Sequence, residues 1–297
     1  MLLILKDKRI SSSGTEKTIE MLRDKLQQKS VPTQVGIFED LEILIKQNEP
    51  KIFLSGENIK QYSTIFFRKV GKNRTLAFLI TMLAQKYGIN FFDRLYAFTN
   101  EPGKLKQTFM LALRGVSVPK TYFAVKYDDK KIVAAIDFLA LPIVVKLSVS
   151  KKGQGVYLAH SQEDLTEILK KNKGIEVLLQ EFIDNEFDYR ILVLEKEIVC
   201  AEKRTRNGSE EFRNNVFLGA AEEFLEIGKL EQQLREIAVA AAVAVDIQIA
   251  GVDVVVGRDG KAYVFEVNRS PAFTHDDEIS PELNKLAEFL ELCEKRK

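Results

Sequence analysis

An Asp259-Gly260 pair lies between two β-rich runs near the C-terminus, and it is the feature that most limits how this chain can fold. Such a pair predicts a β-hairpin, because a type I′ turn needs positive φ at both of its central residues. Counting outward from that turn places Asp253 opposite Glu266 on the neighbouring strand. Because side chains alternate along a strand, Asn268 is expected on the same face as Glu266.

Two carboxylates held side by side on an otherwise apolar hairpin repel each other and destabilise the pairing. A divalent cation relieves that repulsion, and oxygen ligands from Asp253, Glu266 and Asn268 suit magnesium. The alternative is that both acids face water, or that a bulge breaks the register.

Strand-like and helix-like segments alternate over residues 1–97, which predicts an open α/β layer. The segments expected to be strands are Leu2–Lys6, Thr33–Phe38, Lys51–Leu54, Thr64–Arg68 and Ile89–Phe92, and the expected helices are Thr15–Gln28 and Leu76–Tyr87.

The remaining two-thirds of the chain is expected to mix short strands with helices. Helices are expected at Lys104–Arg114, Ile132–Leu139, Glu163–Lys171 (with Ser161 as its cap) and Lys229–Ala244. Extended segments are expected at Lys120–Val125, Leu141–Leu147, Val156–Ala159, Val177–Ile183, Tyr189–Leu194, Glu197–Lys203, Gly251–Val256 and Lys261–Val267.

Lys146 ends an apolar strand and precedes a polar, glycine-bearing loop, Ser148–Gly155. A lysine there either lies along the sheet edge with its ammonium in water or binds phosphate. Small, flexible residues allow backbone N–H groups to close over phosphates, although the loop lacks the Gly-Lys-Ser/Thr ending of a Walker A motif. A plain surface hairpin is the alternative.

Basic side chains gather after Tyr189, and arginines clustered with amides suit phosphate or carboxylate oxygens. For Lys203 and Arg206 we favour a solvated charged edge, whereas Arg204 and Arg213 gain weight from the resemblance described below. The cluster comprises Asp188, Arg190, Lys203, Arg204, Arg206, Arg213, Asn214 and Asn215.

Composition limits the class of protein. The 297 residues exceed what one compact core usually holds, so two or three lobes are expected. A formal net charge of +1 gives no overall attraction to nucleic acid or membrane. The two cysteines, Cys200 and Cys293, fit neither a disulfide framework nor a zinc site. Because no apolar run approaches the ~20 residues of a membrane helix, we expect a cytoplasmic protein.

Taken in order, these segments resemble the ATP-grasp superfamily, and within it the RimK-like glutamate ligases. The similarity runs from about Phe67 to about Pro271, roughly two-thirds of the chain, while the residues before it match only in their α/β alternation. The segments that carry it are Val144–Leu147 with Gly153–Gly155, Leu179–Ile183, Phe212–Asn215, Gly251–Asp253 and Glu266–Pro271.

The resemblance implies a role for each matching residue. It implies nucleotide binding by Lys104, Lys146, Ser148, Gly153, Gly155, Gln180, Glu181, Phe182, Asp188, Arg213 and Asn215. It implies catalytic roles for Lys146, Arg204 and Arg213. It implies magnesium ligation by Asp253, Glu266 and Asn268, in agreement with the hairpin geometry.

The resemblance also implies an α/β (α+β) fold with three lobes: an N-terminal α/β domain (1–97), a central lid lobe (98–182) and a C-terminal lobe with the metal site (183–297). The expected cofactors are ATP and Mg²⁺, with Mn²⁺ as an alternative cation. The expected activity joins a carboxylate to an amine through an acyl phosphate, with an amino acid as donor and a small molecule, peptide, protein or cofactor precursor as acceptor.

Two departures from the family pattern stand out. Gly103 occupies a position that usually carries an acid, just before Lys104. Pro271–His275 replaces the family's usual ending after the magnesium asparagine, in a region that borders the acceptor site. His275 is therefore either a substrate contact or a surface histidine.

Two other functions are compatible with these residues. One is a nucleotide-binding module without turnover that recruits a partner, although the complete set of Lys146, Asp253, Glu266 and Asn268 argues against it. The other is a kinase that does not ligate. No direct binding to nucleic acid or membrane is expected, and association into homo-oligomers is common in the family.

Overall fold

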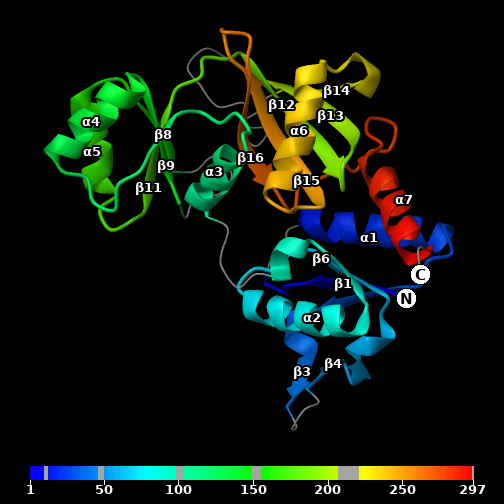
Figure 1. The fold of residues 1–297 in the computed structure, drawn as a ribbon. Helices are drawn as coiled ribbons and strands as arrows, with labels where there is room; N and C mark the ends of the chain where they lie inside the picture. The colour runs from blue at the N-terminus through cyan, green and yellow to red at the C-terminus, as the bar shows by residue number, and fades with distance from the viewer. Residues whose placement is uncertain (10–12, 46–49, 98–102, 149–154, 207–220, 296–297) are drawn as a thin grey trace.

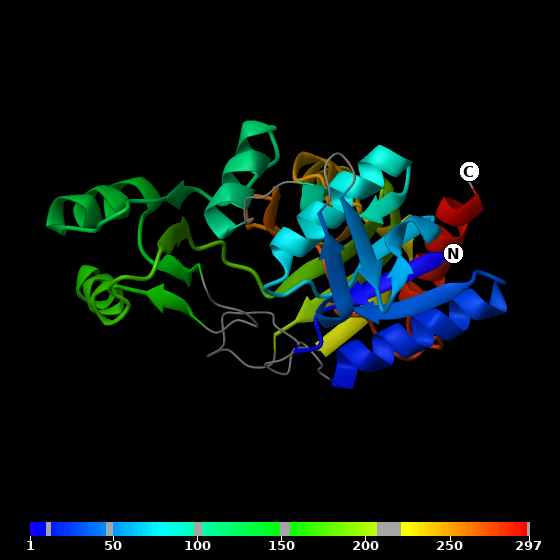
Figure 2. The same cartoon turned by 90° about the horizontal axis from the view of Figure 1, so that it is seen from below.

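The computed structural model describes residues 1–9, 13–45, 50–97, 103–148, 155–206 and 221–295. None of the helices in these ranges has the length and apolar content needed to cross a membrane. The described chain forms three lobes, each organised around one main sheet (Figure 1). Seen from below, the central lobe extends away from the other two (Figure 2). The expected mixed α/β architecture is confirmed.

The N-terminal lobe is a parallel four-stranded sheet with strand order β2-β1-β6-β7 and a helix on each face. The first strand is buried on both faces, which explains its unbroken apolar run. A left-handed Gly88, with φ of 67°, ends the second helix as expected. The elements are β1 (Leu2–Lys6), α1 (Ser13–Gln28), β2 (Thr33–Ile37), β6 (Thr64–Phe67), α2 (Arg74–Tyr87) and β7 (Asn90–Phe92).

A small antiparallel sheet, ordered β3-β4-β5, adjoins this lobe. It consists of β3 (Leu41–Leu44), β4 (Lys51–Leu54) and β5 (Glu57–Asn58). Only the middle strand was expected from the sequence.

The central lobe is an antiparallel sheet with order β10-β9-β11-β8, covered on one face by two helices. Ser161 caps the second helix by accepting a hydrogen bond from the Asp164 N–H at 3.1 Å, as expected. The elements are β8 (Thr121–Tyr122), α4 (Asp129–Leu139), β9 (Ile143–Leu147), β10 (Val156–Ala159), α5 (Gln162–Lys171) and β11 (Val177–Glu181).

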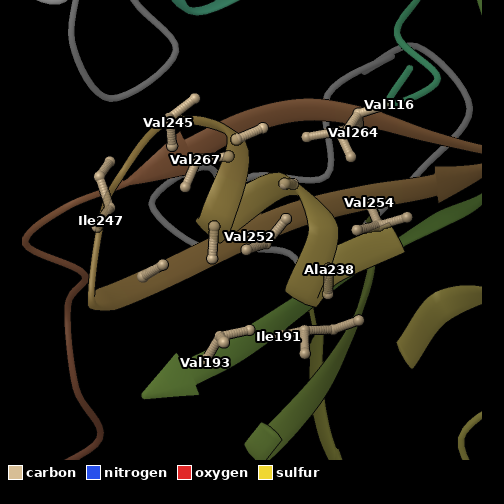
Figure 3. Close-up of a cluster of buried hydrophobic side chains, with 14 of the residues drawn as sticks. Val116, Ile191, Val193, Ala238, Val245, Ile247, Val252, Val254, Val264 and Val267 are labelled. Carbon is tan, nitrogen blue, oxygen red and sulfur yellow. The ribbon is translucent and has the colours of Figure 1, made fainter. Parts of the chain in front are cut away.

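The C-terminal lobe is an antiparallel five-stranded sheet with order β14-β13-β12-β15-β16. One face packs against α6, whose alanines allow the helix to approach the strands closely (Figure 3). The elements are α3 (Lys104–Leu113), β12 (Phe187–Leu194), β13 (Glu197–Thr205), β14 (Ala221–Leu225), α6 (Gln232–Ala244), β15 (Ile249–Val256) and β16 (Ala262–Asn268).

The N-terminal and C-terminal lobes share one apolar core. It combines β1, β6 and α1 with part of the other face of the five-stranded sheet and with α7 (Glu282–Lys295), so the two lobes are held as one body. The chain termini meet nearby, where the Met1 ammonium lies 3.3 Å from a Glu294 carboxylate oxygen. The central lobe, by contrast, has a core of its own.

The helices and strands that were not expected include β3, β5, β14 and α7. The last carries a clear helical signal, since Leu283, Leu286, Ala287 and Leu290 recur at helical spacing and are all buried.

Candidate functional site

The strand register of the C-terminal sheet gathers charged residues on the face opposite α6. Arg190 on β12 pairs with Asp253 on β15, and Asp253 pairs with Glu266 on β16. Directly opposed residues of antiparallel strands point to the same face, so these three side chains form a row across three strands. The predicted opposition of Asp253 and Glu266 is confirmed.

The predicted two-residue type I′ turn, however, is wrong. The Gly257 N–H donates to the Lys261 carbonyl at 2.9 Å, which closes a three-residue loop, and only Gly260 in that loop has a positive φ. The register then shifts once more between Asp253 and Val254, where Phe265 is the extra residue on β16. The bulge compensates for the longer turn and restores the opposition of the two acids.

Two arginines hold the Asp253 carboxylate. Arg190 donates to its two oxygens at 2.9 and 3.0 Å, and an Arg204 nitrogen lies 3.3 Å from one of them. Burial opposes ionisation of Asp253, but the charges of both arginines outweigh it and hold the pKa of this carboxyl below its usual value. Asp253 is therefore a carboxylate at neutral pH, ready to bind a cation.

Arg204 also binds Asp188, whose carboxylate accepts from Nε at 2.7 Å. Burial raises the pKa of Asp188 to about 6, although Arg204 opposes that rise. Both side chains are buried, so the expected catalytic arginine and the expected ribose contact lie together at the edge of the charged row.

Glu266 and Asn268 complete the expected metal-binding set. Desolvation by the surrounding protein raises the pKa of Glu266, and the charge of Asp253 adds to the rise, although the side chain also reaches solvent. Asn268 donates from Nδ2 to Asp253 at 3.3 Å, which leaves its amide oxygen available. The described residues hold no cluster of three metal-binding His, Cys, Asp or Glu side chains, but two carboxylates and an amide fit a hard cation that prefers oxygen ligands.

Two lysines from other elements face this row. Lys146 lies on the face of the central sheet that the helices leave uncovered, since it pairs with Leu178 while its neighbours on β9 enter the helix-covered core. Burial lowers the pKa of Lys146 to about 8, against the opposing charge of Glu266. Its Nζ lies 5.2 Å from the centre of the Phe265 ring, so the bulge residue also lines the site.

Lys104, at the first position of α3, donates to the Leu147 carbonyl at 2.7 Å. Burial lowers its pKa, and the charge of Glu266 counteracts this. The two expected nucleotide lysines therefore both interact electrostatically with Glu266, which brings α3, the central sheet and the C-terminal sheet to one site.

The segment expected to hold adenine ends β11. Gln180 is buried and donates to the Thr121 hydroxyl at 2.9 Å, while its own side-chain oxygen has no partner among the described residues. Glu181 accepts from the Lys120 N–H at 2.7 Å, and Phe182 follows directly. The free oxygen of Gln180 is a ready acceptor next to the connection between the lobes.

The glycine-bearing loop is described only at its two ends. The Ser148 N–H donates to the Glu176 carbonyl at 3.0 Å, and Gly155 has a φ of 71° and accepts from the Leu147 N–H. Gly153, Arg213 and Asn215, which were expected to bind nucleotide, lie outside the described residues.

Three further residues can be placed. Lys203 points to the opposite face, with Nζ 4.1 Å from the centre of the Phe187 ring. Arg206 follows the last residue of β13. His275 lies 2.8 Å from the Thr18 hydroxyl of α1, and so contacts the N-terminal lobe.

The segment before His275 is tied to the N-terminal lobe as well. The buried Arg68 donates to the Ser270 hydroxyl at 2.7 Å and to the Pro271 carbonyl at 2.9 Å. The departure from the family pattern at Pro271–His275 therefore lies where the charged row meets the end of the parallel sheet.

Sequence reasoning placed Arg190 in the basic cluster but gave it no role of its own, and it missed Phe265. Arg190 had a signal, because it lies two residues after Asp188 and so on the same face of the strand. No sequence signal pointed to Phe265. Its position depends on a bulge, and strand pairing, not local residue preference, decides where that bulge lies.

Known proteins resemble this chain in sequence and in fold. Residues 102–286 match the model of the RimK-like ATP-grasp domain. A probable alpha-L-glutamate ligase of Vibrio atlanticus (strain LGP32) is 31% identical over 248 residues, 80% of this chain and 79% of the relative. Another, of Methanococcoides burtonii, is 32% identical over 233 residues, 76% and 75% of the two chains.

Solved structures share the fold at lower sequence identity. The ATP-grasp ligase PsnB in complex with a minimal precursor superposes with a TM-score of 0.75 at 15% identity, over 99% of each chain. The D-alanine–D-alanine ligase of Bacillus anthracis in complex with ATP gives a TM-score of 0.66 at 16% identity, over 99% of this chain and 97% of that one.

Proposed function

Because the chain belongs to the RimK-like ATP-grasp family and is an ATP-dependent carboxylate–amine ligase, we propose that it uses magnesium–ATP to convert a carboxylate into an acyl phosphate, which an amine then attacks. A carboxylate is a poor electrophile, and phosphorylation supplies the leaving group that amide formation needs. The observation that supports this most strongly is the meeting of Lys104, Lys146 and the Asp253–Glu266 pair around one face of the C-terminal sheet.

Asp253, Glu266 and Asn268 would hold the magnesium ion, which neutralises phosphate charge when it is bound. Arg190 and Arg204 fix the Asp253 carboxylate in place and keep it ionised. No nucleophilic side chain is required, because positioning and charge neutralisation supply most of the catalysis in phosphoryl transfer.

The other roles follow the family pattern. Lys104 and Lys146 would bind phosphate oxygens, and Arg204 and Arg213 would stabilise the transferring group. Gln180, Glu181 and Phe182 would hold adenine, with Asp188 at the ribose and Asn215 near the phosphates. The loop containing Ser148, Gly153 and Gly155 would cover the phosphates and exclude water from the acyl phosphate.

The substrates follow from the relatives. Curated relatives carry the name probable alpha-L-glutamate ligase, and PsnB structures contain a minimal precursor or a precursor peptide. We propose that this chain adds an amino acid to a peptide, protein or cofactor acceptor. The division into residues 1–97, 98–182 and 183–297, use of Mn²⁺ in place of Mg²⁺ and association into a homo-oligomer belong to the same proposal.

The test is ADP release from magnesium–ATP with a panel of amino acids and acidic peptides, each supplied alone and in pairs. The proposal expects ADP with one carboxylate–amine pair and a condensed product by mass. Asp253→Asn is expected to abolish most of that turnover while leaving the fold intact. Asp259→Asn, an exposed change in the turn of the same hairpin, is the matched control and keeps wild-type activity.

Two outcomes would contradict the proposal. One is wild-type turnover by Asp253→Asn. The other is a stable phosphorylated product that forms without any dependence on an amine, which would indicate a kinase.

A further inference from the structure

A buried glutamate, Glu202, extends the charged row by one strand beyond the residues assigned above. It lies on β13 and pairs directly with Arg190, so its side chain shares the face that carries Asp253. Only 5% of it is exposed. Neither the hairpin geometry nor the family pattern gives this residue a role.

One carboxyl oxygen of Glu202, Oε1, is buried and has no hydrogen-bond partner among the described residues. The two neighbouring arginines do not satisfy it, because Arg190 donates to Asp253 and Arg204 to Asp188. A buried polar atom left without a partner costs free energy, so an acceptor here is better explained by a ligand that donates to it.

A second carboxyl group adjoins Glu202. Glu222 on β14 pairs with Arg204, which places it diagonally next to Glu202 on the same face, where the two carboxyl groups interact. Burial raises the pKa of Glu202 to about 8, and its contact with Glu222 adds to the rise. Glu222 is exposed at the rim, so a ligand can reach the pair from solvent.

We propose that Glu202 and Glu222 form a subsite for a positively charged nitrogen on the amine-bearing substrate. The inference rests on the proposed function, in which Asp253, Glu266 and Asn268 hold the magnesium ion and the amine partner is the substrate that brings a positive charge. Arg190 and Arg204 donate hydrogen bonds to Asp253 and Asp188, so their charges act on Glu202 without satisfying its Oε1.

The spacing between strands limits which amine substrates could bind at this subsite. Glu202 lies two strands from Asp253, which corresponds to about 10 Å across the sheet. A nitrogen bound there is too far from the proposed metal ligand to be the one that attacks the acyl phosphate. The substrate therefore carries a second, cationic nitrogen several bonds from its attacking amine, as lysine and ornithine do.

The test compares L-lysine with L-norleucine, which differ mainly in the terminal ammonium. Binding of each to the protein loaded with Mg²⁺ and ADP is measured by calorimetry. Wild-type protein is expected to bind lysine about tenfold more tightly, the scale of a charge-assisted hydrogen bond. Glu202→Gln is expected to reduce that preference to about twofold or less, because the amide keeps the shape but cannot take a negative charge beside the ammonium.

Two further variants keep the test decisive. Glu223→Gln, the neighbouring position on the opposite face of β14, is the matched control and retains the preference. Glu222→Gln, at the exposed rim, weakens lysine binding even if the change at the buried Glu202 disturbs folding.

Equal binding of lysine and norleucine by the wild-type protein would overturn the subsite, as would an unchanged lysine preference in a folded Glu202→Gln variant. Ligation that uses only neutral or acidic amines would also overturn it, while leaving the proposed ligase intact. A lysine preference that depends on Glu202, without ligation of any pair, would instead support the subsite and contradict the proposed function.

Discussion

One face of the C-terminal sheet is divided into a charged half and an apolar half, and both halves are built from the same strands. On β12, Asp188 and Arg190 belong to the charged row, whereas Leu192 and Leu194, further along the same face, enter the core shared with the N-terminal lobe. Alternation along a strand sets only which face a residue occupies. The charged half faces Lys146 of the central lobe and is suited to chemistry. The apolar half packs against helices α1 and α7 and joins the two lobes.

Substitutions in the charged half are expected to have the largest effect on activity. Glu266→Gln is expected to lower turnover by at least about 100-fold, because Glu266 is proposed to bind the metal directly, and loss of a residue that only orients a metal ligand already costs about 10–100-fold. Its folding is expected to stay near wild type, since Glu266 reaches solvent. Steady-state ADP release and a thermal melt measure the two quantities separately, and a large loss of stability would erase the distinction between the halves.

The apolar half should show the reverse behaviour. Leu192→Ala removes a side chain that is only 2% exposed, and it is expected to lower the free energy of unfolding by about 2–5 kcal/mol. Urea denaturation checks this, with ADP release measured under conditions where the variant is folded. Near-normal stability together with strongly reduced turnover would place Leu192 with the charged half.

A buried carboxylate at the edge of the apolar half predicts a pH effect. Asp93 accepts hydrogen bonds at 2.9 Å from the N–H groups of Gln248 and Ile249, where β15 begins. Burial raises its pKa to about 7, so the folded state holds this proton more tightly than the unfolded chain. Protonation of Asp93 therefore increases the free energy of unfolding as pH falls from 8 toward 4. The same contribution is lost as pH rises through about 7.

Asp93→Asn is expected to remove that slope. Between pH 8 and pH 5 the wild type should gain about 1–3 kcal/mol of unfolding free energy relative to the variant. Denaturant melts at several pH values test this, with the exposed Asp137→Asn as the control. Parallel pH profiles of wild type and Asp93→Asn would show that Asp93 does not titrate in this range.

The smallest effect concerns competition within the charged row. Arg190 donates to both oxygens of Asp253, the same oxygens that a magnesium ion would use. Arg190→Met removes a positive charge beside the site and is expected to lower the Mg²⁺ concentration for half-maximal stabilisation by ADP about threefold or more. Titration of Mg²⁺ in a thermal-shift assay checks this, and weaker magnesium binding in the variant would mean that fixing the Asp253 carboxylate in place outweighs the competition for its oxygens.

The sequence specified more of the elements than of the contacts between them. Local patterns identified the strands that carry Lys146, Asp253 and Glu266, and the Asp259-Gly260 pair located the hairpin. The turn type was wrong, and the acids face each other only because the bulge at Phe265 compensates for the longer loop. Such a bulge depends on long-range pairing, which no local residue preference records.

The partners of the site residues were harder to foresee for the same reason. The pairing of Arg190 with Asp253 joins strands more than sixty positions apart, as the separation of 63 shows. The shared core that joins the first and last lobes likewise brings together α1 and α7, from opposite ends of the chain. Family resemblance supplied the nucleotide-binding roles, and those roles remain proposals.

We propose that the charged half directs phosphoryl transfer to a carboxylate. The most direct measurement uses a carboxylate substrate labelled with oxygen-18, incubated with ATP, Mg²⁺ and the amine partner, followed by mass analysis of the inorganic phosphate. We expect one labelled oxygen to move from the carboxylate into phosphate. The amine attacks the carbonyl carbon of the acyl phosphate, and the bond between that carbon and the phosphate-bearing oxygen breaks. Phosphate without the label, alongside amide product, would contradict an acyl-phosphate route.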